Sequence, residues 1–238
     1  MALTPAARLT TPDPPPMMTY EEFLAWAGDD IRAEWVDGEV IVFMPTGRRH
    51  VLLVNFLGDL ISFYVRLRRL GQVVGEPFQF FTKGRRAARR PDVAVILTAH
   101  LDRLTPAGME GAPDLVVEVI SEGGEARDRQ EKRQEYAGAG VSEYWIVEGR
   151  EGRHGVAFYE LQPDGSYAEL GPDDRGRLHS QVLKGFWLDP AWLAGNELPN
   201  LFEVLAEIAT DARVELQALA RATRSGSWTI GPGGAGPV

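Results

Sequence analysis

Two carboxylate residues, Asp92 and Glu118, stand where a charged group needs a chemical explanation. Glu118 interrupts the apolar run LVVEVI, and burying a carboxylate there is costly unless another group pairs with it. Asp92 follows Pro91 and opens the apolar run DVAVILT. Two carboxylates that approach each other repel unless a cation lies between them, and a divalent metal ion would suit such a pair. The sequence therefore suggests metal-assisted chemistry, with both residues as candidate catalytic residues and metal ligands.

Each carboxylate also has a simpler interpretation. Glu118 could be a buried glutamate with a satisfied ion pair, or one that reaches water at a strand end. A Pro-Asp pair at the start of a strand often only terminates a turn. Whether the two residues meet in space separates these interpretations from a shared site.

The two apolar runs predict neighbouring strands over residues 92–98 and 114–121. Both are apolar on both faces, which is typical of interior strands shielded on each side by helices. If the strands are antiparallel, Asp92 faces Glu118, and a connection of about 17 residues joins the strands. If they are parallel with matched beginnings, Glu118 lies about 13 Å further along, and no shared site forms.

Elements before these strands must support them. Thr19 and Glu22 have the spacing of a capping box, which predicts a helix over residues 19–27. Asp37-Gly38 between apolar arms predicts a hairpin. The helical spacing of apolar residues from His50 to Leu70 predicts the main core helix, with Gly71 as its left-handed cap.

Other segments of the chain predict further strands, helices and a hairpin. We expect a strand over residues 72–81, a helix over residues 125–139 that ends at Gly140, and a strand in SEYWIV. Asp164-Gly165 predicts another hairpin. The expected domain organisation is a disordered leader (1–17), one domain (18–200), a C-terminal helix (201–223) and a disordered tail (224–238).

Composition limits the kind of site. The chain has no cysteine, so a metal site must use carboxylates, histidines, carbonyls and water, and carboxylates favour Mg²⁺ or Mn²⁺. No run approaches the roughly 18 apolar residues of a membrane span, and the first residues lack a signal-peptide pattern. We therefore expect a cytoplasmic protein with no membrane partner.

Charge gives conflicting indications about nucleic acid. The net charge of -9 argues against broad, non-specific adhesion to nucleic acid, because that affinity comes mainly from Lys and Arg. Basic residues nevertheless gather directly before Asp92: Lys83, Arg85, Arg86, Arg89 and Arg90. They could form a basic rim that holds a nucleic-acid backbone, or simply a solvated loop.

Four motifs occur in a specific order: EWVDGEVI, RRPDVAVI, GAPDLVVEVIS and DRQEKRQEYAGAGVSEYWIVE. Together they resemble the Uma-two family of restriction-endonuclease-like proteins, from residue 19 to about residue 200. The order is much more specific than any one motif. The resemblance implies the PD-(D/E)xK nuclease superfamily and an α/β (α+β) fold. That fold is a restriction-endonuclease-like mixed central sheet flanked by helices, here with additional β-hairpins.

The resemblance also assigns roles to residues. It implies that Asp92 and Glu118 bind Mg²⁺ (or Mn²⁺), with the carbonyl of Val119 as a further ligand. The superfamily pattern places a lysine two residues after the Glu, where this chain has Ile120. In the Uma-two pattern a lysine of the following helix substitutes, and Lys132 matches it. The alternative is an ordinary surface ion pair between Lys132 and Asp128.

Two further residues match family positions. Glu34 could be a third metal ligand or hold a metal-bound water, or it could be an exposed hairpin glutamate. His50, at the start of the core helix, would suit a phosphate beside the helix amides, or it could be a capping or surface histidine.

The function implied by the resemblance is metal-dependent endonuclease activity, the hydrolysis of nucleic-acid phosphodiester bonds, with DNA as the expected partner. The alternative on the same fold is a non-catalytic nucleic-acid-binding or assembly module, which the missing lysine at position 120 and the acidic net charge both permit. A third hypothesis is a structural protein that uses its C-terminal helix to form a homodimer.

Overall fold

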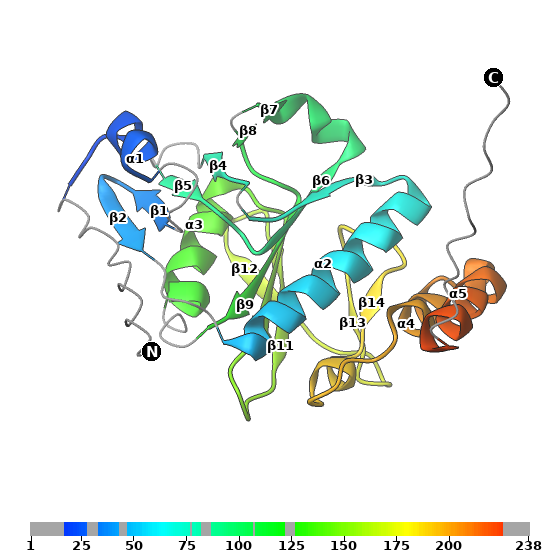
Figure 1. Ribbon diagram of the computed structural model, residues 1–238. Helices are drawn as coiled ribbons and strands as arrows, with labels where there is room; N and C mark the ends of the chain where they lie inside the picture. The colour runs from blue at the N-terminus through cyan, green and yellow to red at the C-terminus, as the bar shows by residue number, and fades with distance from the viewer. Residues whose placement is uncertain are drawn as a thin grey trace, which may run out of the picture.

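The computed structural model describes residues 17–27, 33–42, 47–76, 78–81, 87–106, 108–121 and 127–225. Within them, a six-stranded central sheet carries a long helix on one face and a shorter helix on the other, beside a second six-stranded sheet (Figure 1). The fold is therefore mixed α/β with additional hairpins, as the sequence predicts. The expected disordered leader and most of the expected tail lie outside the described residues.

The central sheet has the strand order β12-β11-β10-β9-β6-β3. Its strands are β3 (Gly71–Val74), β6 (Val93–Leu97), β9 (Leu115–Ile120), β10 (Glu143–Glu148), β11 (Val156–Leu161) and β12 (Tyr167–Leu170). Strands β9 and β10 are parallel, and the other neighbours are antiparallel. The sheet is thus mixed, and its two most apolar strands, β6 and β9, lie inside it.

The second sheet has the order β2-β1-β5-β4-β8-β7. Its strands are β1 (Ala33–Val36), β2 (Glu39–Val42), β4 (Phe80–Phe81), β5 (Ala87–Arg89), β7 (Leu104–Thr105) and β8 (Gly108–Glu110). A separate two-stranded ladder joins β13 (Leu178–His179) and β14 (Trp187–Leu188). The β1–β2 turn is the predicted hairpin, with positive φ at Asp37 and Gly38.

The helical elements are α1 (Tyr20–Ala27), α2 (Arg48–Arg68), η1 (Thr98–Arg103), η2 (Arg127–Glu131), α3 (Lys132–Ala139), η3 (Pro190–Leu193), α4 (Leu201–Ile208), η4 (Thr210–Ala212) and α5 (Arg213–Ser225). The capping box of α1 forms as predicted: Glu22 N–H donates to Thr19 Oγ1, and Thr19 N–H donates to Glu22 Oε2. Helix α3 ends at Gly140, whose φ of 89° provides the left-handed cap.

The strand register confirms the antiparallel arrangement of the two carboxylate-bearing runs. Strands β6 and β9 pair with Val93 opposite Val117 and Val95 opposite Leu115. Continued by one residue, this register places Asp92 at the level of Glu118. The alternative parallel arrangement, which would separate the two residues, is wrong.

Each face of the central sheet packs against its own helix. On one face, Val95, Val117 and Val119 join residues of α2 in the largest core cluster. On the other face, Val116 and Ile120 join Tyr136 of α3 in a second cluster. Odd-numbered residues of β9 therefore face α2 and even-numbered residues face α3, as strand alternation requires. By length and composition alone α2 is apolar enough to cross a membrane, yet nine of its residues are buried here.

One predicted helix end and one predicted strand differ in the structure. Helix α2 ends in left-handed Arg69 (φ 54°), not in Gly71. Gly71 instead begins β3, where a Cβ atom would lie only 2.0 Å from the carbonyl oxygen of Ile96. The predicted strand over residues 72–81 is also divided: β3 and β4 belong to different sheets.

The predicted C-terminal helix is broken into α4 and α5. The break lies at η4, where Asp211 accepts two hydrogen bonds from the Arg68 guanidinium at 2.6 and 2.7 Å. Val204 and Leu205 of α4 and Leu216 of α5 all join the main core cluster. The turn lets α5 fold back on α4, so both short helices bury an apolar face.

Candidate active site

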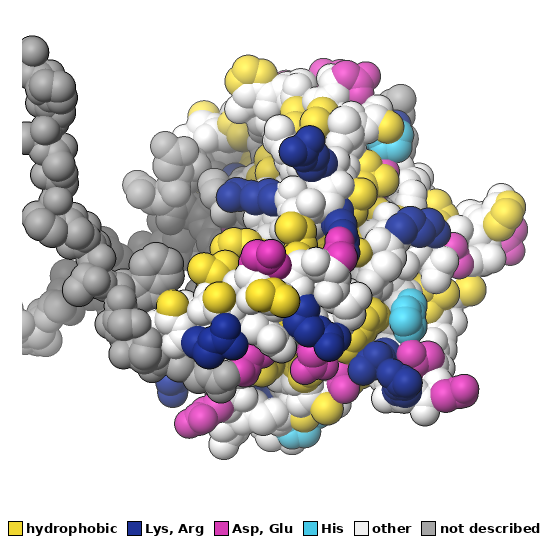
Figure 2. All heavy atoms as spheres, turned by 90° about the vertical axis from the view of Figure 1, so that its right-hand side faces the viewer, with side chains coloured by type: hydrophobic (Ala, Val, Ile, Leu, Met, Phe, Trp, Pro, Cys, Tyr) yellow, Lys and Arg dark blue, Asp and Glu magenta, His cyan; other side chains and the backbone are white. Residues whose placement is uncertain are grey.

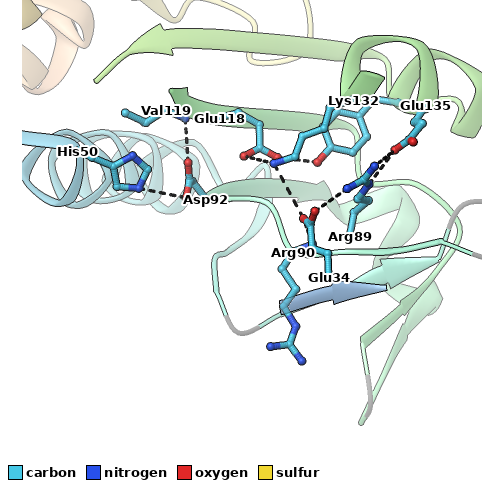
Figure 3. Close-up of polar contacts among 10 residues, drawn as sticks. Glu34, His50, Arg89, Arg90, Asp92, Glu118, Val119, Lys132 and Glu135 are labelled. Carbon is cyan, nitrogen blue, oxygen red and sulfur yellow. Dashed lines mark hydrogen bonds and ion pairs between the residues drawn. The ribbon is translucent and has the colours of Figure 1, made fainter. Parts of the chain in front are cut away.

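Asp92 is held at the start of β6, between β9 and the first turn of α2 (Figure 3). The side chain is 8% exposed, and Val119 N–H donates to its Oδ2 at 2.8 Å. Its Oδ1 lies 3.6 Å from His50 Nε2. Burial alone raises the pKa of Asp92, but the hydrogen bond and charge of His50, with Lys132 and the Val119 amide, lower it below its usual value.

Glu118 points from β9 towards α3. It is 3% exposed, Tyr136 O–H donates to its Oε1 at 2.5 Å, and Lys132 Nζ lies 3.0 Å from its Oε2. Burial has the largest effect on the pKa of Tyr136, and the negative charge of Glu118 has the next largest; together they raise it well above its usual value. The hydroxyl therefore keeps its proton and donates a hydrogen bond. Glu118 is therefore a buried glutamate with a satisfied ion pair, and the cation in that pair is the lysine that the family resemblance singles out.

Lys132 reaches Glu118 because of how α3 begins. A single π-helical turn, η2, precedes the helix, and such turns are frequent at functional sites. Lys132 and Tyr136 are four residues apart, so they lie on one face of α3, and both contact the same carboxylate. At 4% exposure, Lys132 is not part of a surface ion pair. The side chain of Asp128 lies outside the described residues.

Ile120 stands at the position, two residues after Glu118, where the superfamily pattern has a lysine. Ile120 projects from the same face of β9 as Glu118 and is buried in the α3 cluster. A lysine at that position would extend into the region that Lys132 enters from the helix. In this chain the cation beside Glu118 comes from the helix and not from the strand.

Glu34 is completely buried, so its interpretation as an exposed hairpin glutamate is wrong. Its Oε2 accepts a hydrogen bond from Arg89 at 2.5 Å, and its Oε1 accepts one from the Arg90 amide at 3.0 Å. Lys132 Nζ lies 3.9 Å from Oε1. Burial alone raises the pKa of Glu34, but Lys132 and Arg89 outweigh that effect and hold it below its usual value.

Arg89 has a different position from the one that its sequence neighbours suggest. It is 1% exposed and donates to both Glu34 and Glu135. In this structure it cannot contact a nucleic-acid backbone, because both carboxylates hold it in the interior. Sequence reasoning missed Glu135 altogether; its only signal was its helical spacing of three residues from Lys132.

The other predicted basic contacts divide into two groups. Arg90 is half-buried, its guanidinium points away from the carboxylates, and it lies 5.9 Å from the centre of the Phe23 ring (Figure 3). Lys83, Arg85 and Arg86 lie outside the described residues. On the face seen in Figure 2, basic and acidic side chains are interspersed and form no continuous basic patch among the described residues.

His50 joins the site from the first turn of α2, as the sequence suggests. Its side chain is buried, and Nδ1 has no hydrogen-bond partner in the described part of the chain. Helix α2 has no side-chain cap at Gly47, so the amides of its first turn lack that partner. A cavity of about 450 Å³ runs from His50 and Asp92 along α2 and β3.

The donor atoms fit a hard divalent cation. Asp92 and Glu118 offer buried carboxylate oxygens. The hydrogen bond from the Val119 amide holds the Asp92 carboxylate against β9, directly beside Glu118. Mg²⁺ is commonly held by one or two carboxylates and keeps several waters. The described residues contain no group of three or more acidic, histidine or cysteine side chains placed to hold a metal ion. Any metal would therefore depend on these two carboxylates, one of which already contacts Lys132.

Comparisons with known proteins bear on the family and the fold. The model of a protein family, Uma2, described as "Putative restriction endonuclease", matches residues 20–191. The chain is also similar to the crystal structure of a putative nuclease belonging to DUF820 from Anabaena variabilis, with a TM-score of 0.60 and 18% sequence identity. That match covers 74% of this chain and 97% of the other, and it shows the shared fold. No curated protein matches.

Proposed function

The chain belongs to the Uma2 family, and from that premise we propose that it is a metal-dependent endonuclease that hydrolyses phosphodiester bonds in nucleic acid. The observation that carries the proposal is the contact of 3.0 Å between Lys132 Nζ and Glu118 Oε2. It supplies, from α3, the cation that the superfamily motif has on the strand. Asp92, Glu118 and Lys132 then form a complete set of two carboxylates and one lysine.

Asp92, Glu118 and the carbonyl of Val119 would hold the cation, Mg²⁺ or Mn²⁺. The chemistry that such a cation supplies when bound is polarisation of the phosphodiester and stabilisation of negative charge on its oxygens. Glu34 is not included among these ligands, because its carboxylate oxygens already accept hydrogen bonds from Arg89 and the Arg90 amide. We propose that Glu34 acts on Lys132 and not as a third ligand.

The side chains of the site would share the remaining work. The Lys132 ammonium, positioned by Glu118 and Glu34, orients the attacking water and stabilises the negative charge that develops on the phosphoryl group. His50 and the first-turn amides of α2 favour the phosphate beside Asp92. The water oxygen forms the new bond to phosphorus and releases a proton to solvent. The bond between phosphorus and the departing ester oxygen breaks, and that oxygen takes up a proton from solvent.

The test is a cleavage panel. Labelled duplex DNA, single-stranded DNA and RNA are incubated with Mg²⁺, Mn²⁺ or Ca²⁺ and with wild type or the Asp92→Ala/Glu118→Ala double variant. Glu110→Ala/Asp174→Ala is the matched control, since it removes two exposed carboxylates elsewhere. We expect cleavage by wild type and the control only. Equal cleavage by the site variant would indicate a contaminating nuclease and contradict the assignment.

One observation favours a second candidate, a non-catalytic binding module. Lys132 and Tyr136 already satisfy Glu118 without a metal. Calorimetric titration of Mn²⁺ into wild type and the double variant separates the two functions. Metal binding that needs both carboxylates, together with cleavage, supports the enzyme. Metal-independent nucleic-acid binding without cleavage supports the module.

A further inference from the structure

The cavity between α2 and β3 adjoins the carboxylate site, because Asp92 lines its end. Its inner end is formed by buried His50, Asp92 and Val93. Half-buried valines of α2 and β3 form its walls: Val54, Val73 and Val74. Exposed polar side chains lie at its mouth: Asn55, Asp59 and Glu76. The groove is therefore apolar in its middle and acidic at its rim.

Two glycines line this groove. Gly58 on α2 faces it, and the nearest atom to an added Cβ would be Val93 Cγ2 at 3.8 Å. Gly75 follows β3, where an added Cβ would lie 2.7 Å from the carbonyl oxygen of Asp92. The chain can pass over Asp92 at this point because no side chain is present.

The charge of the lining decides which part of a nucleic acid fits. Asp59 and Glu76 repel phosphate, so the groove does not suit the sugar-phosphate backbone. A nucleobase is neutral, has apolar faces that match the valine walls, and carries amino groups that carboxylates accept. Adenine, cytosine and guanine have such an exocyclic amine, whereas thymine and uracil present carbonyl oxygens there.

We propose that the groove binds the base of one unpaired nucleotide next to the phosphate that is cleaved, and that Asp59 and Glu76 select bases with an amino group. The inference rests on the proposed function for the identity of its ligand as a nucleic acid. It makes the preferred substrate a single strand or an unpaired end, because a base within a duplex cannot leave its stack without a cost of a few kcal/mol.

The experiment measures binding without cleavage. Fluorescein-labelled hexamers of deoxycytidine, deoxyadenosine or thymidine, and a hairpin duplex, are titrated with the full chain in EDTA, and anisotropy is recorded. We expect the cytosine and adenine hexamers to bind about five- to tenfold more tightly than the thymidine hexamer, the size of one good base contact. The duplex should bind more weakly than either.

Two variants test the groove itself. Asp59→Asn/Glu76→Gln keeps the shape of the rim and should abolish the preference over thymidine. Gly58→Leu fills the groove without removing a helix-forming residue, and it should weaken binding of every single strand about tenfold or more. Gly138→Leu on α3 is the matched control, because no atom lies within 4 Å of an added Cβ there. It should bind like wild type.

The outcomes separate this inference from the proposed function. Equal affinity for all three hexamers, or unchanged binding by Gly58→Leu, would overturn the base-binding groove even if the chain cleaves nucleic acid. Base-dependent binding that Gly58→Leu abolishes would support the groove even if no metal produces cleavage in the panel described above.

Discussion

Lys132 is the single residue whose removal should separate binding from hydrolysis. We expect Lys132→Met to lower kcat about 10²- to 10³-fold, the usual effect of losing one electrostatic donor at a reacting oxygen. The change also leaves Glu118 buried opposite an uncharged side chain, which should cost about 3–5 kcal/mol of unfolding free energy. Single-turnover cleavage, measured well below the unfolding midpoint, would check the first effect, and urea denaturation the second.

The matched control for this prediction is Lys184→Met, which removes an exposed lysine far along the chain. It should leave both the cleavage rate and the stability unchanged. A Lys132→Met protein that is folded and cleaves at the wild-type rate would contradict the role given to Lys132.

Glu34 should make stability depend on pH in a defined direction. Its pKa is lowered in the folded state, so its ion pairs stabilise the fold fully above the unfolded-state pKa of about 4.3. That stabilisation is lost as the pH falls through the lower, folded-state value. In EDTA, we expect Glu34→Gln to be less stable than wild type at pH 7, and the difference to shrink below pH 4.3.

Urea denaturation of both proteins at a series of pH values would measure this difference. Glu39→Gln, an exposed residue of the same hairpin, is the control and should follow wild type throughout. A gap between wild type and Glu34→Gln that stays constant down to the lowest pH would contradict the proposed pairing of Glu34 with Arg89 and Lys132.

At the scale of elements, the end of β10 packs closely against the residues of β9 that we propose as metal ligands. Gly149 follows β10, and a Cβ there would lie 2.6 Å from both the Ile120 carbonyl oxygen and Val119 Cγ1. We expect Gly149→Ala to displace the end of β9. The Val119 amide, which donates a hydrogen bond to Asp92, should move with it. Mn²⁺ affinity should fall about tenfold, as for loss of a supporting contact around a metal site.

Gly155→Ala provides the comparison within the same hairpin, since its Cβ would meet only Glu148 Cβ, at the ordinary distance of 3.9 Å. Calorimetry should show wild-type Mn²⁺ affinity for this variant. Equal affinities for the two alanine variants would mean that the end of β9 does not control the site.

Several elements could be predicted from the sequence because their signals are local. The capping box of α1, the Asp37-Gly38 turn and the Gly140 cap each follow from a few neighbouring residues. The sequence left the arrangement of β6 and β9 open between antiparallel and parallel, and the antiparallel one, which a shared site required, is the one observed. In these cases backbone preference and packing favour the same structure.

Other features could not be predicted because they depend on distant residues. The position of Arg89 in the sequence indicated an exposed basic loop, whereas Glu34 and Glu135 bind it in the interior. The break between α4 and α5 depends on Arg68, and the close passage at Gly71 depends on Ile96. The roles of the metal and of Lys132 in hydrolysis came from the family resemblance and stay predictions.

At the scale of the whole molecule, a metal ion that binds only the folded chain should raise its thermal stability. At a Mn²⁺ concentration ten times the Kd, linkage contributes about 1.4 kcal/mol. For a chain of 238 residues this corresponds to an increase in Tm of about 3–5 °C. Differential scanning fluorimetry with increasing Mn²⁺ would measure it.

The Asp92→Ala/Glu118→Ala variant should show no such increase, whereas Glu110→Ala/Asp174→Ala should behave like wild type. An equal Mn²⁺ response in the two double variants would place the binding site elsewhere on this acidic chain.

Ile120 shares its face of β9 with Glu118, the carboxylate that Lys132 contacts, and this has an evolutionary consequence. A chain with lysine at both positions would keep a cation beside Glu118 throughout an exchange of one position for the other. We therefore infer that strand-lysine and helix-lysine nucleases can interconvert through a two-lysine intermediate without losing activity. The variant Ile120→Lys reproduces that intermediate, and Ile120→Lys/Lys132→Met places the lysine on the strand alone. If neither folded protein cleaves a substrate of the wild type, the two lineages did not exchange their lysines by this route.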